Sequence, residues 1–201
     1  MELKAHDLTC ERGGRIVFRG ISFSVEAGNL LQLVGPNGSG KSTLLRLIAG
    51  LCDIADGSLA LDGGHEELSI GQQCHYAAHQ DAIKPALTVV ENLRFWSGFL
   101  GGGNVDGALA AFDLKRLETF PAALLSAGQR HRLSLSRLAL LPRPIWLLDE
   151  PTVGLDSASL EKLWALIRDH LVKGGLAIAA THVPLPFPGT EKLDLGVEAA
   201  A

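Results

Sequence analysis

The sequence is poor in aromatic residues and in cysteine, and both shortages narrow the class of protein. Aromatic residues make up 5% of the 201 residues, and the three cysteines, Cys10, Cys52 and Cys74, form no Cys-x-x-Cys pair. Without such a pair, the cysteines indicate neither a zinc site nor a redox motif. An odd number of cysteines is typical of a protein in a reducing compartment. The formal net charge is -4, which argues against the basic surface typical of nucleic-acid binders. We therefore expect no nucleic-acid partner.

The sequence also lacks an apolar run as long as the roughly 18 residues that a transmembrane helix needs. The closest candidate, residues 133–148, is interrupted by Arg137, Pro142, Arg143 and Pro144. The first residues, MELKAHDLTCERGG, mix charges from the second position onward and do not resemble a secretory signal. We therefore expect a soluble chain that meets a membrane only through partner subunits.

Strands alternate with helices over much of the chain. Residues 15–25 and 30–34 are rich in apolar residues and predict strands, and residues 41–49 predict a helix. Residues 145–148 and 176–180 are further apolar runs typical of buried strands. This alternation predicts an α/β fold with a mainly parallel sheet. The last dozen residues show no clear pattern, and we expect them to fray.

The middle of the chain has a helical pattern instead. Thr88 and Glu91 have the spacing of a capping box, and Ser126 and Gln129 repeat it. Apolar residues at helical spacing follow each pair. We therefore expect a helical lobe at about residues 85–141, inserted into the α/β core of a single domain that spans residues 1–201.

The most informative motif is a glycine-rich loop between a predicted strand and a predicted helix. Its residues are Gly35, Pro36, Asn37, Gly38, Ser39, Gly40, Lys41 and Ser42, followed by Thr43. They satisfy the G-x-x-x-x-G-K-[ST] pattern, in which backbone N–H groups and a helix N-terminus bind phosphate. Lys41 would add a charge at the β- and γ-phosphates, and Ser42 would offer a hydroxyl to Mg²⁺. An accidental turn is the alternative, but the flanking strand and helix are the context that the motif requires.

Two further segments carry chemistry that fits this loop. Asp149 and Glu150 end an apolar run, where Asp149 can support a metal and Glu150 can polarise an attacking water. Ser126 can present a hydroxyl and free N–H groups to an anion at the start of a helix. Each segment by itself is a weak signal, because solvated acids and ordinary helix caps look the same.

Together these motifs resemble the ABC ATPase family, in the family's order and over nearly the whole chain. In chain order, the matching segments are residues 35–43 for the Walker A loop, Gln80 for the Q-loop, residues 125–129 (LSAGQ) for the signature, residues 147–151 for Walker B, residues 154–156 for the D-loop, and Thr181 and His182 for the H-loop. The resemblance implies a P-loop NTPase core with an N-terminal antiparallel β portion and an inserted helical lobe.

The resemblance also implies how the protein works. Two copies would form a homodimer, with ATP held between the Walker A loop of one copy and the signature of the other. Ser126, Gly128 and Gln129 would contact the nucleotide across the interface, and Asp156 would act at the dimer contact. Hydrolysis would then let the dimer open, since ATP binds one conformation better than the other.

The same resemblance assigns roles around the phosphates. Lys41, Gln80, Glu150 and His182 would be catalytic, with His182 at the γ-phosphate. Ser42, Gln80 and Asp149 would hold Mg²⁺.

The chain departs from the family's pattern at two positions. Arg12 stands where the family often stacks an aromatic residue on adenine, and a guanidinium can also stack on a base. A solvent-exposed Arg12 without that role is an equal alternative. Ala127 replaces the usual glycine of the signature, which adds one methyl group, and we expect function to be retained.

Within the family, the chain resembles the ATP-binding subunits of cytochrome c maturation haem exporters. The resemblance lies in residues 78–88 (AHQDAIKPALT), 91–95 (ENLRF) and 126–132 (SAGQRHR). It implies integral membrane permease partners, a peripheral location on the cytoplasmic face of a bacterial inner membrane, and haem export or delivery for c-type cytochromes. The sequence has no Cys-x-x-Cys-His site, so we expect this chain not to bind haem.

Other functions stay open alongside this one. The chain could serve an ABC transporter for another solute, or act as a soluble ABC ATPase on nucleic acid or ribosomes. The latter usually have two cassettes or a long coiled coil, and the sequence has no heptad run. A small-molecule kinase would not need the LSAGQ segment, and a nucleotide sensor without activity would not need Glu150 and His182.

Overall fold

The structure, a computed structural model, describes residues 1–198, and the chain divides into two compact units. Unit 1 comprises Met1–Tyr76, Arg143–Glu150 and Asp169–Ala201. Unit 2 comprises Ala77–Pro142 and Pro151–Arg168. The chain therefore passes from one unit to the other directly after Glu150.

An antiparallel sheet forms the N-terminal part of unit 1. It consists of β1 (Glu2–Arg12), β2 (Arg15–Glu26) and β4 (Asp56–Asp62), in the order β2-β1-β4. Both neighbours pair with β1 in antiparallel register, and Arg12 faces Arg15 across the turn that joins β1 to β2. The expected N-terminal antiparallel portion is therefore confirmed, as is the predicted strand at residues 15–25.

The second sheet has the strand order β5-β6-β7-β3-β8. Its strands are β5 (Cys74–Ala77), β6 (Ile145–Asp149), β7 (Leu176–Ala180), β3 (Leu30–Val34) and β8 (Glu191–Asp194). β3 runs parallel to both β7 and β8, and β6 runs parallel to β7. Every residue of β6 and β7 is buried, which explains their continuous apolar sequences. The predicted mainly parallel sheet is confirmed.

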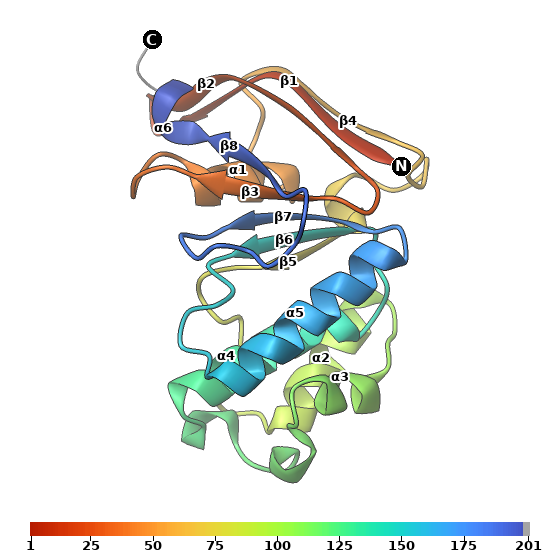
Figure 1. Ribbon diagram of the computed structural model, residues 1–201. Coiled ribbons are helices and arrows are strands. Elements are labelled where there is room, and N and C mark those ends of the chain that lie inside the picture. Colours follow the sequence, from red (N-terminus) through yellow and green to blue (C-terminus); the bar gives the residue numbers. More distant parts are fainter. Residues whose placement is uncertain (199–201) are drawn as a thin grey trace. The chain divides into compact units, whose positions relative to one another are not determined.

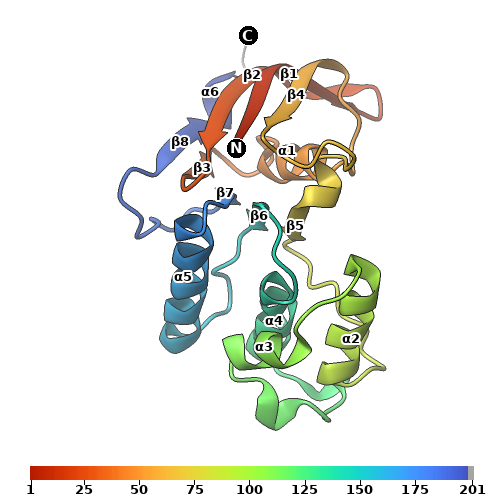
Figure 2. The same ribbon diagram turned by 90° about the vertical axis from the view of Figure 1, so that its right-hand side faces the viewer.

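Helix α1 (Lys41–Ile48) lies between the two sheets of unit 1 (Figures 1 and 2). It contacts β6 and β7 on one side and β1 on the other. Leu44, Leu45 and Ile48 are at most 1% exposed and join one hydrophobic core with residues of both sheets. This packing fixes the first turn of α1 at the carboxyl end of β3, where the glycine-rich loop lies.

The C-terminal residues are more ordered than their sequence predicts. β8 is followed by α6 (Leu195–Glu198), and Leu195 is buried in the core of unit 1. The expectation of a frayed, patternless end is wrong for residues 190–198, and the rest of that segment, residues 199–201, lies outside the described residues.

Unit 2 is built from helices. Its helices are α2 (Val89–Leu100), α3 (Val105–Ala111) and α4 (Ala127–Ser136), and α3 contacts both α2 and α4. Two turns of 3-10 helix lie between α3 and α4, and a third follows α4. The 3-10 turns are η2 (Lys115–Leu117), η3 (Ala122–Leu124) and η4 (Arg137–Ala139); a further one, η1 (Gly71–Gln73), belongs to unit 1. Helix α5 (Ser157–Val172) begins in unit 2 and ends in unit 1.

Both predicted capping boxes are confirmed. Thr88 caps α2 and exchanges hydrogen bonds with Glu91, and Ser126 caps α4 and exchanges hydrogen bonds with Gln129. These caps set where each helix begins, because they satisfy N–H groups that have no partner inside the helix. The start of the signature segment is therefore fixed by its own sequence.

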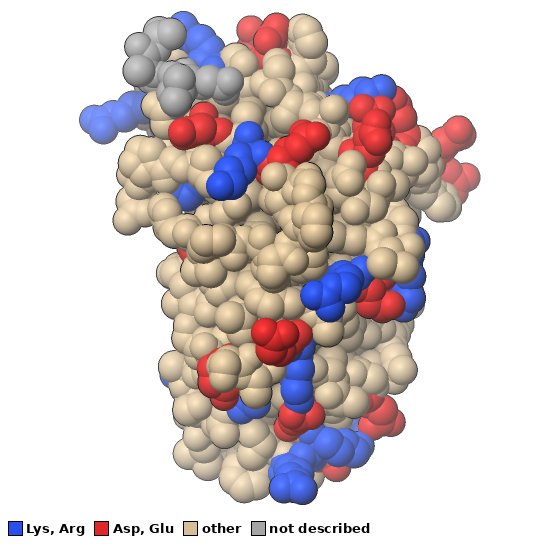
Figure 3. Space-filling model, in the orientation of Figure 1, with Lys and Arg blue, Asp and Glu red and all other residues tan. Residues whose placement is uncertain are grey.

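Among residues 1–198, no helix combines the length and the apolar character needed to cross a bilayer. On the face shown in Figure 3, acidic and basic side chains are interspersed.

Candidate functional site

The glycine-rich loop of residues 35–42 connects β3 to α1 in a conformation that only glycine adopts easily. Gly35, Gly38 and Gly40 have φ angles of 131°, 85° and 99°. A Cβ atom on Gly35 would lie 2.9 Å from the Ser39 hydroxyl, and one on Gly40 would lie 3.0 Å from the Phe18 ring. These glycines therefore keep the loop tight, so its N–H groups can face an anion.

The loop ends at a helix N-terminus that no side chain neutralises. Gly40, the N-cap of α1, offers no side-chain cap, and the first turn of α1 contains no acidic residue. The Lys41 ammonium donates hydrogen bonds to the carbonyl oxygens of Gly35, at 2.7 Å, and Pro36, at 2.9 Å. The Ser39 hydroxyl is buried without a hydrogen-bond partner. A cation, a positive helix end and a free hydroxyl together fit a phosphate group.

The loop meets the carboxylate at the end of β6. The Ser42 hydroxyl donates to Asp149 Oδ1 at 3.0 Å, and Asp149 Oδ2 is buried without a partner. An orphaned carboxylate oxygen beside a hydroxyl fits Mg²⁺, which takes one or two protein oxygens and completes its shell with phosphate and water. Among the described residues, no group of three or more His, Cys, Asp or Glu side chains could hold a metal ion.

Glu150 has a left-handed backbone, which is uncommon outside glycine. Its φ is 51°, and its N–H donates to the Ala180 carbonyl at 2.8 Å. This conformation costs on the order of 1 kcal/mol, and sites with such strain concentrate where function needs a side chain re-aimed. The His182 Nε2 atom lies 3.7 Å from Glu150 Oε1. The ends of β6 and β7 thus bring these two predicted residues together.

Gln32 is a residue of this site that sequence reasoning missed. It lies in β3, is 4% exposed, and donates from Nε2 to the carbonyl oxygens of Thr181, at 3.0 Å, and Val183, at 3.2 Å. It therefore holds the backbone on both sides of His182. The sequence did contain a signal for this residue, because Gln32 is the polar residue inside an otherwise apolar strand.

The C-terminal segment also contacts the phosphate loop, which the sequence did not indicate. A Cβ on Gly196 would lie 2.8 Å from the Pro36 ring, and one on Gly35 would lie 3.3 Å from Asp194 Oδ1. The Gly196 N–H donates to Asp194 Oδ1 at 2.8 Å. β8 and α6 therefore pack against the backbone that would surround the phosphates.

The signature segment, residues 125–129, begins α4 in unit 2. Ser126 and Ala127 are exposed, and the Ser126 hydroxyl accepts a hydrogen bond from the Gln129 N–H at 3.2 Å. A Cβ on Gly128 would lie 3.0 Å from the Gly154 carbonyl oxygen. Glycine is therefore required where α4 approaches the loop that follows Glu150.

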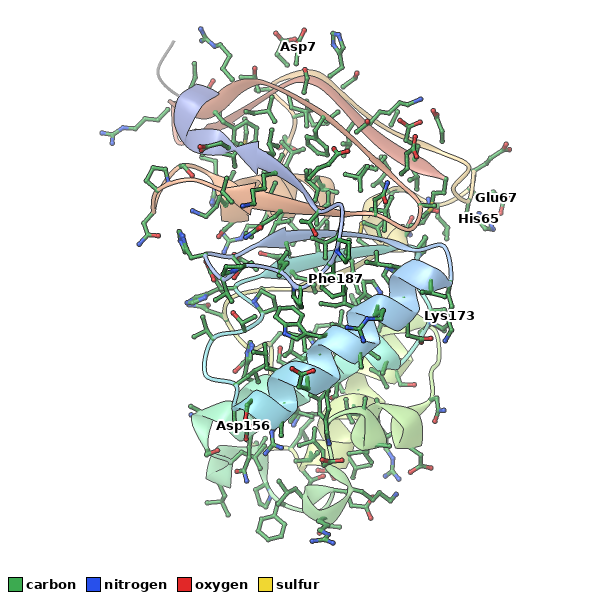
Figure 4. All side chains as sticks on the ribbon, in the orientation of Figure 1. Asp7, His65, Glu67, Asp156, Lys173 and Phe187 are labelled. Carbon is green, nitrogen blue, oxygen red and sulfur yellow. The ribbon has the colours of Figure 1, made fainter. Side chains whose placement is uncertain are left out.

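Asp156 caps helix α5. Its Oδ1 accepts the Ser159 N–H at 2.7 Å at the start of α5, where Figure 4 shows it. Hydrogen bonds from Ser159 lower the pKa of Asp156 below its usual value.

The remaining predicted residues are divided between the two units. Gln80 is exposed in unit 2, and Arg12 is exposed in unit 1 at the end of β1. The predicted residues of the phosphate loop, with Asp149, Glu150 and His182, belong to unit 1.

Comparisons with known proteins identify relatives over nearly the whole chain. Residues 18–153 match the family model described as ABC transporter. The chain is 54% identical to the cytochrome c biogenesis ATP-binding export protein CcmA of Bradyrhizobium diazoefficiens, over 95% of this chain and 96% of that protein. It is 52% identical to the protein of the same name from Nitrobacter winogradskyi, with the same coverage. Among solved structures it is similar to a dimeric ATP-binding cassette in a post-hydrolysis state bound to ADP and Pi, with 26% identity, a TM-score of 0.76, and coverage of 90% of this chain and 88% of that chain.

Proposed function

The chain belongs to the ABC transporter family, and from this membership we propose that it is the ATP-hydrolysing subunit of an exporter that serves cytochrome c biogenesis. Relatives that are 54% and 52% identical over 95% of the chain are named for ATP binding, for export and for this biogenesis. The exported species under this proposal is haem, or haem delivered to acceptor proteins.

The observation that carries the ATPase function is the contact between Ser42 and Asp149 behind the cationic loop. Lys41 would exchange its loop carbonyls for the β- and γ-phosphates. Ser42 and Asp149, together with Gln80, would hold Mg²⁺, which when bound polarises the phosphoryl oxygens and neutralises charge there.

Glu150 and His182 serve the attacking water and the γ-phosphate. The Glu150 carboxylate would accept a hydrogen bond from the water and orient it for attack in line with the leaving oxygen. His182 would donate a hydrogen bond to the γ-phosphate, and the hydrogen bonds from Gln32 to Thr181 and Val183 would keep the His182 backbone in place. The left-handed backbone of Glu150 aims its carboxylate toward His182, 3.7 Å away.

The functional form is a homodimer with two shared ATP sites. Exposure of Ser126 and Ala127 at the start of α4 suits contact with a nucleotide held by a second copy. Ser126, Gly128 and Gln129 would contact that nucleotide, and Asp156 would act near the dimer contact. The similar solved cassette is a dimer, which supports this arrangement. Arg12 would stack on the adenine.

The membrane partners are permease subunits of the cytochrome c maturation type. The helical lobe, at about residues 85–141, would face them, and the chain would lie peripherally on the cytoplasmic face of the inner membrane. Gln80, which precedes this lobe, would link the phosphate site to the partners. Under this proposal the permease subunits supply the path across the bilayer.

Mass spectrometry of the proteins that copurify with the full chain from mildly solubilised native membranes tests this proposal. We expect membrane proteins of cytochrome c maturation, enriched over a matched purification of an unrelated tagged protein. Recovery of an unrelated permease would refute the role in cytochrome c biogenesis and leave the ATPase activity untouched.

A further inference from the structure

His131 makes two contacts on opposite sides of its ring. It lies on α4, and its Nδ1 atom is 3.0 Å from Asp81 Oδ1 while its Nε2 atom is 3.0 Å from the Pro151 carbonyl oxygen. The side chain is 11% exposed, so water competes little for either contact. All three residues belong to unit 2.

The chemistry of the two partners determines the charge of the ring. A carboxylate and a carbonyl oxygen only accept hydrogen bonds, so both ring nitrogens of His131 must carry hydrogen. Burial by itself lowers the pKa of His131, but hydrogen bonds to Asp81 and Pro151 outweigh burial and raise the pKa above its usual value. The negative charge of Asp81 also favours the charged form of the buried Arg137. This one carboxylate therefore interacts electrostatically with two cations.

Each partner of His131 is the neighbour in sequence of a residue in the ATPase site. Asp81 follows Gln80, and Pro151 follows Glu150. Residues 78–87 contain no helix or strand, so hydrogen bonds to other segments, from both backbone and side-chain groups, fix where this segment lies. The Trp96 indole donates to the Ala82 carbonyl at 3.1 Å and continues the attachment that begins at Asp81.

The same face of α4 contacts the segment after Glu150 at a second point. Gly128 precedes His131 by three positions, which places both on one side of the helix. A Cβ on Gly128 would lie 3.0 Å from the Gly154 carbonyl oxygen. α4 therefore touches residues 151–154 through Gly128 and His131, and it touches Asp81 through the other nitrogen of His131.

We propose that His131 is a positioning residue of the ATPase, whose doubly protonated ring holds the residue after Gln80 and the residue after Glu150 at a fixed spacing. The inference rests on the proposed ATPase function and adds a determinant to it. His131 does not touch the nucleotide, and it acts by limiting how far Gln80 and Glu150 can shift. Displacement of a reacting group by about 1 Å can slow a reaction up to about 100-fold.

Three substitutions in the full chain separate the two links. His131→Asn keeps a donor near the position of Nδ1 and so retains the Asp81 link alone, whereas His131→Gln keeps a donor near Nε2 and retains the Pro151 link alone. His131→Ala removes both. We expect kcat for ATP to fall on the order of tenfold or more in His131→Ala and less in the other two, with KM for ATP within about twofold of wild type, because the phosphate loop is intact.

A matched control and a direct measurement keep the test decisive. His65→Asn replaces an exposed histidine (Figure 4) and should leave kcat unchanged. If His131→Ala does not fold, His131→Asn and His131→Gln carry the test, and folded variants with wild-type kcat would overturn the proposal. Long-range ¹H–¹⁵N NMR of the wild-type chain at pH 7 should show hydrogen on both ring nitrogens of His131, and a single hydrogen would also overturn it. Wild-type protein without ATP hydrolysis would instead count against the proposed function, with the NMR result still deciding the state of His131.

Discussion

Loss of the Gln32 amide should both destabilise unit 1 and slow ATP turnover. Its Nε2 atom donates to the carbonyl oxygens of Thr181 and Val183, at 3.0 and 3.2 Å, on either side of His182. Gln32→Leu removes both donors while nearly preserving side-chain volume, so it tests the hydrogen bonds rather than the packing.

The size of the effect follows from the exposure of the two carbonyls. Thr181 is 1% exposed, and a buried acceptor left unpaired costs about 1–3 kcal/mol. Val183 is 42% exposed, so water can replace its lost bond at little cost. A buried leucine in place of the amide returns about 1 kcal/mol. The free energy of unfolding should therefore fall by up to about 2 kcal/mol, and by about 1 kcal/mol at the middle of these ranges.

Two assays check this prediction. Urea denaturation followed by tryptophan fluorescence measures the free energy of unfolding, and steady-state hydrolysis measures kcat, which we expect to fall about tenfold as the backbone around His182 loosens. Gln32→Glu keeps the shape but replaces the donor with a buried charge, so it should be less stable than Gln32→Leu. A Gln32→Leu chain with wild-type kcat and a stability within about 0.5 kcal/mol of wild type would refute the reasoning.

Two further predictions concern the signature and a buried histidine. Ser126→Arg places a long side chain at the exposed cap of α4, so ATP-driven dimerisation should fail; an intact ATP-dependent dimer by light scattering would contradict this. Burial lowers the pKa of His170, which stacks on Trp146 with ring centroids 4.0 Å apart, below its ordinary value of 6.5. The unfolded chain then takes up its proton first, so stability should fall as pH drops below about 6.5. The urea midpoint at pH 7.5 and 5.5 should change less in His170→Gln than in wild type, and an equal change would show that another group titrates.

The parts of the fold that the sequence predicts are those with a strong local pattern. β6 and β7 are unbroken apolar runs, and the starts of α2 and α4 carry complete capping boxes. β8, Glu191–Asp194, has one apolar residue in four, so its pairing beside β3 is decided by tertiary contacts that propensity does not contain.

The residues of the site also differ in how far the local sequence predicts them. The phosphate loop is contiguous, so its motif identifies Lys41 and Ser42 directly. The bond from Ser42 to Asp149 joins residues 107 positions apart, and only the strand order of the second sheet brings them together. The contacts of His131 gave no local signal, because its partners Asp81 and Pro151 are 50 and 20 positions away.

ATP turnover by the full chain and by Glu150→Gln is the most direct test of the central claim. The wild-type chain with Mg²⁺ should hydrolyse ATP, whereas Glu150→Gln should bind ATP with similar affinity, lose nearly all turnover and accumulate as an ATP-bound dimer. The substitution keeps the side-chain shape but removes the charge that polarises the attacking water. Near-normal hydrolysis by Glu150→Gln would contradict the account, since the carboxylate at the end of β6 would then not be the group that activates the water.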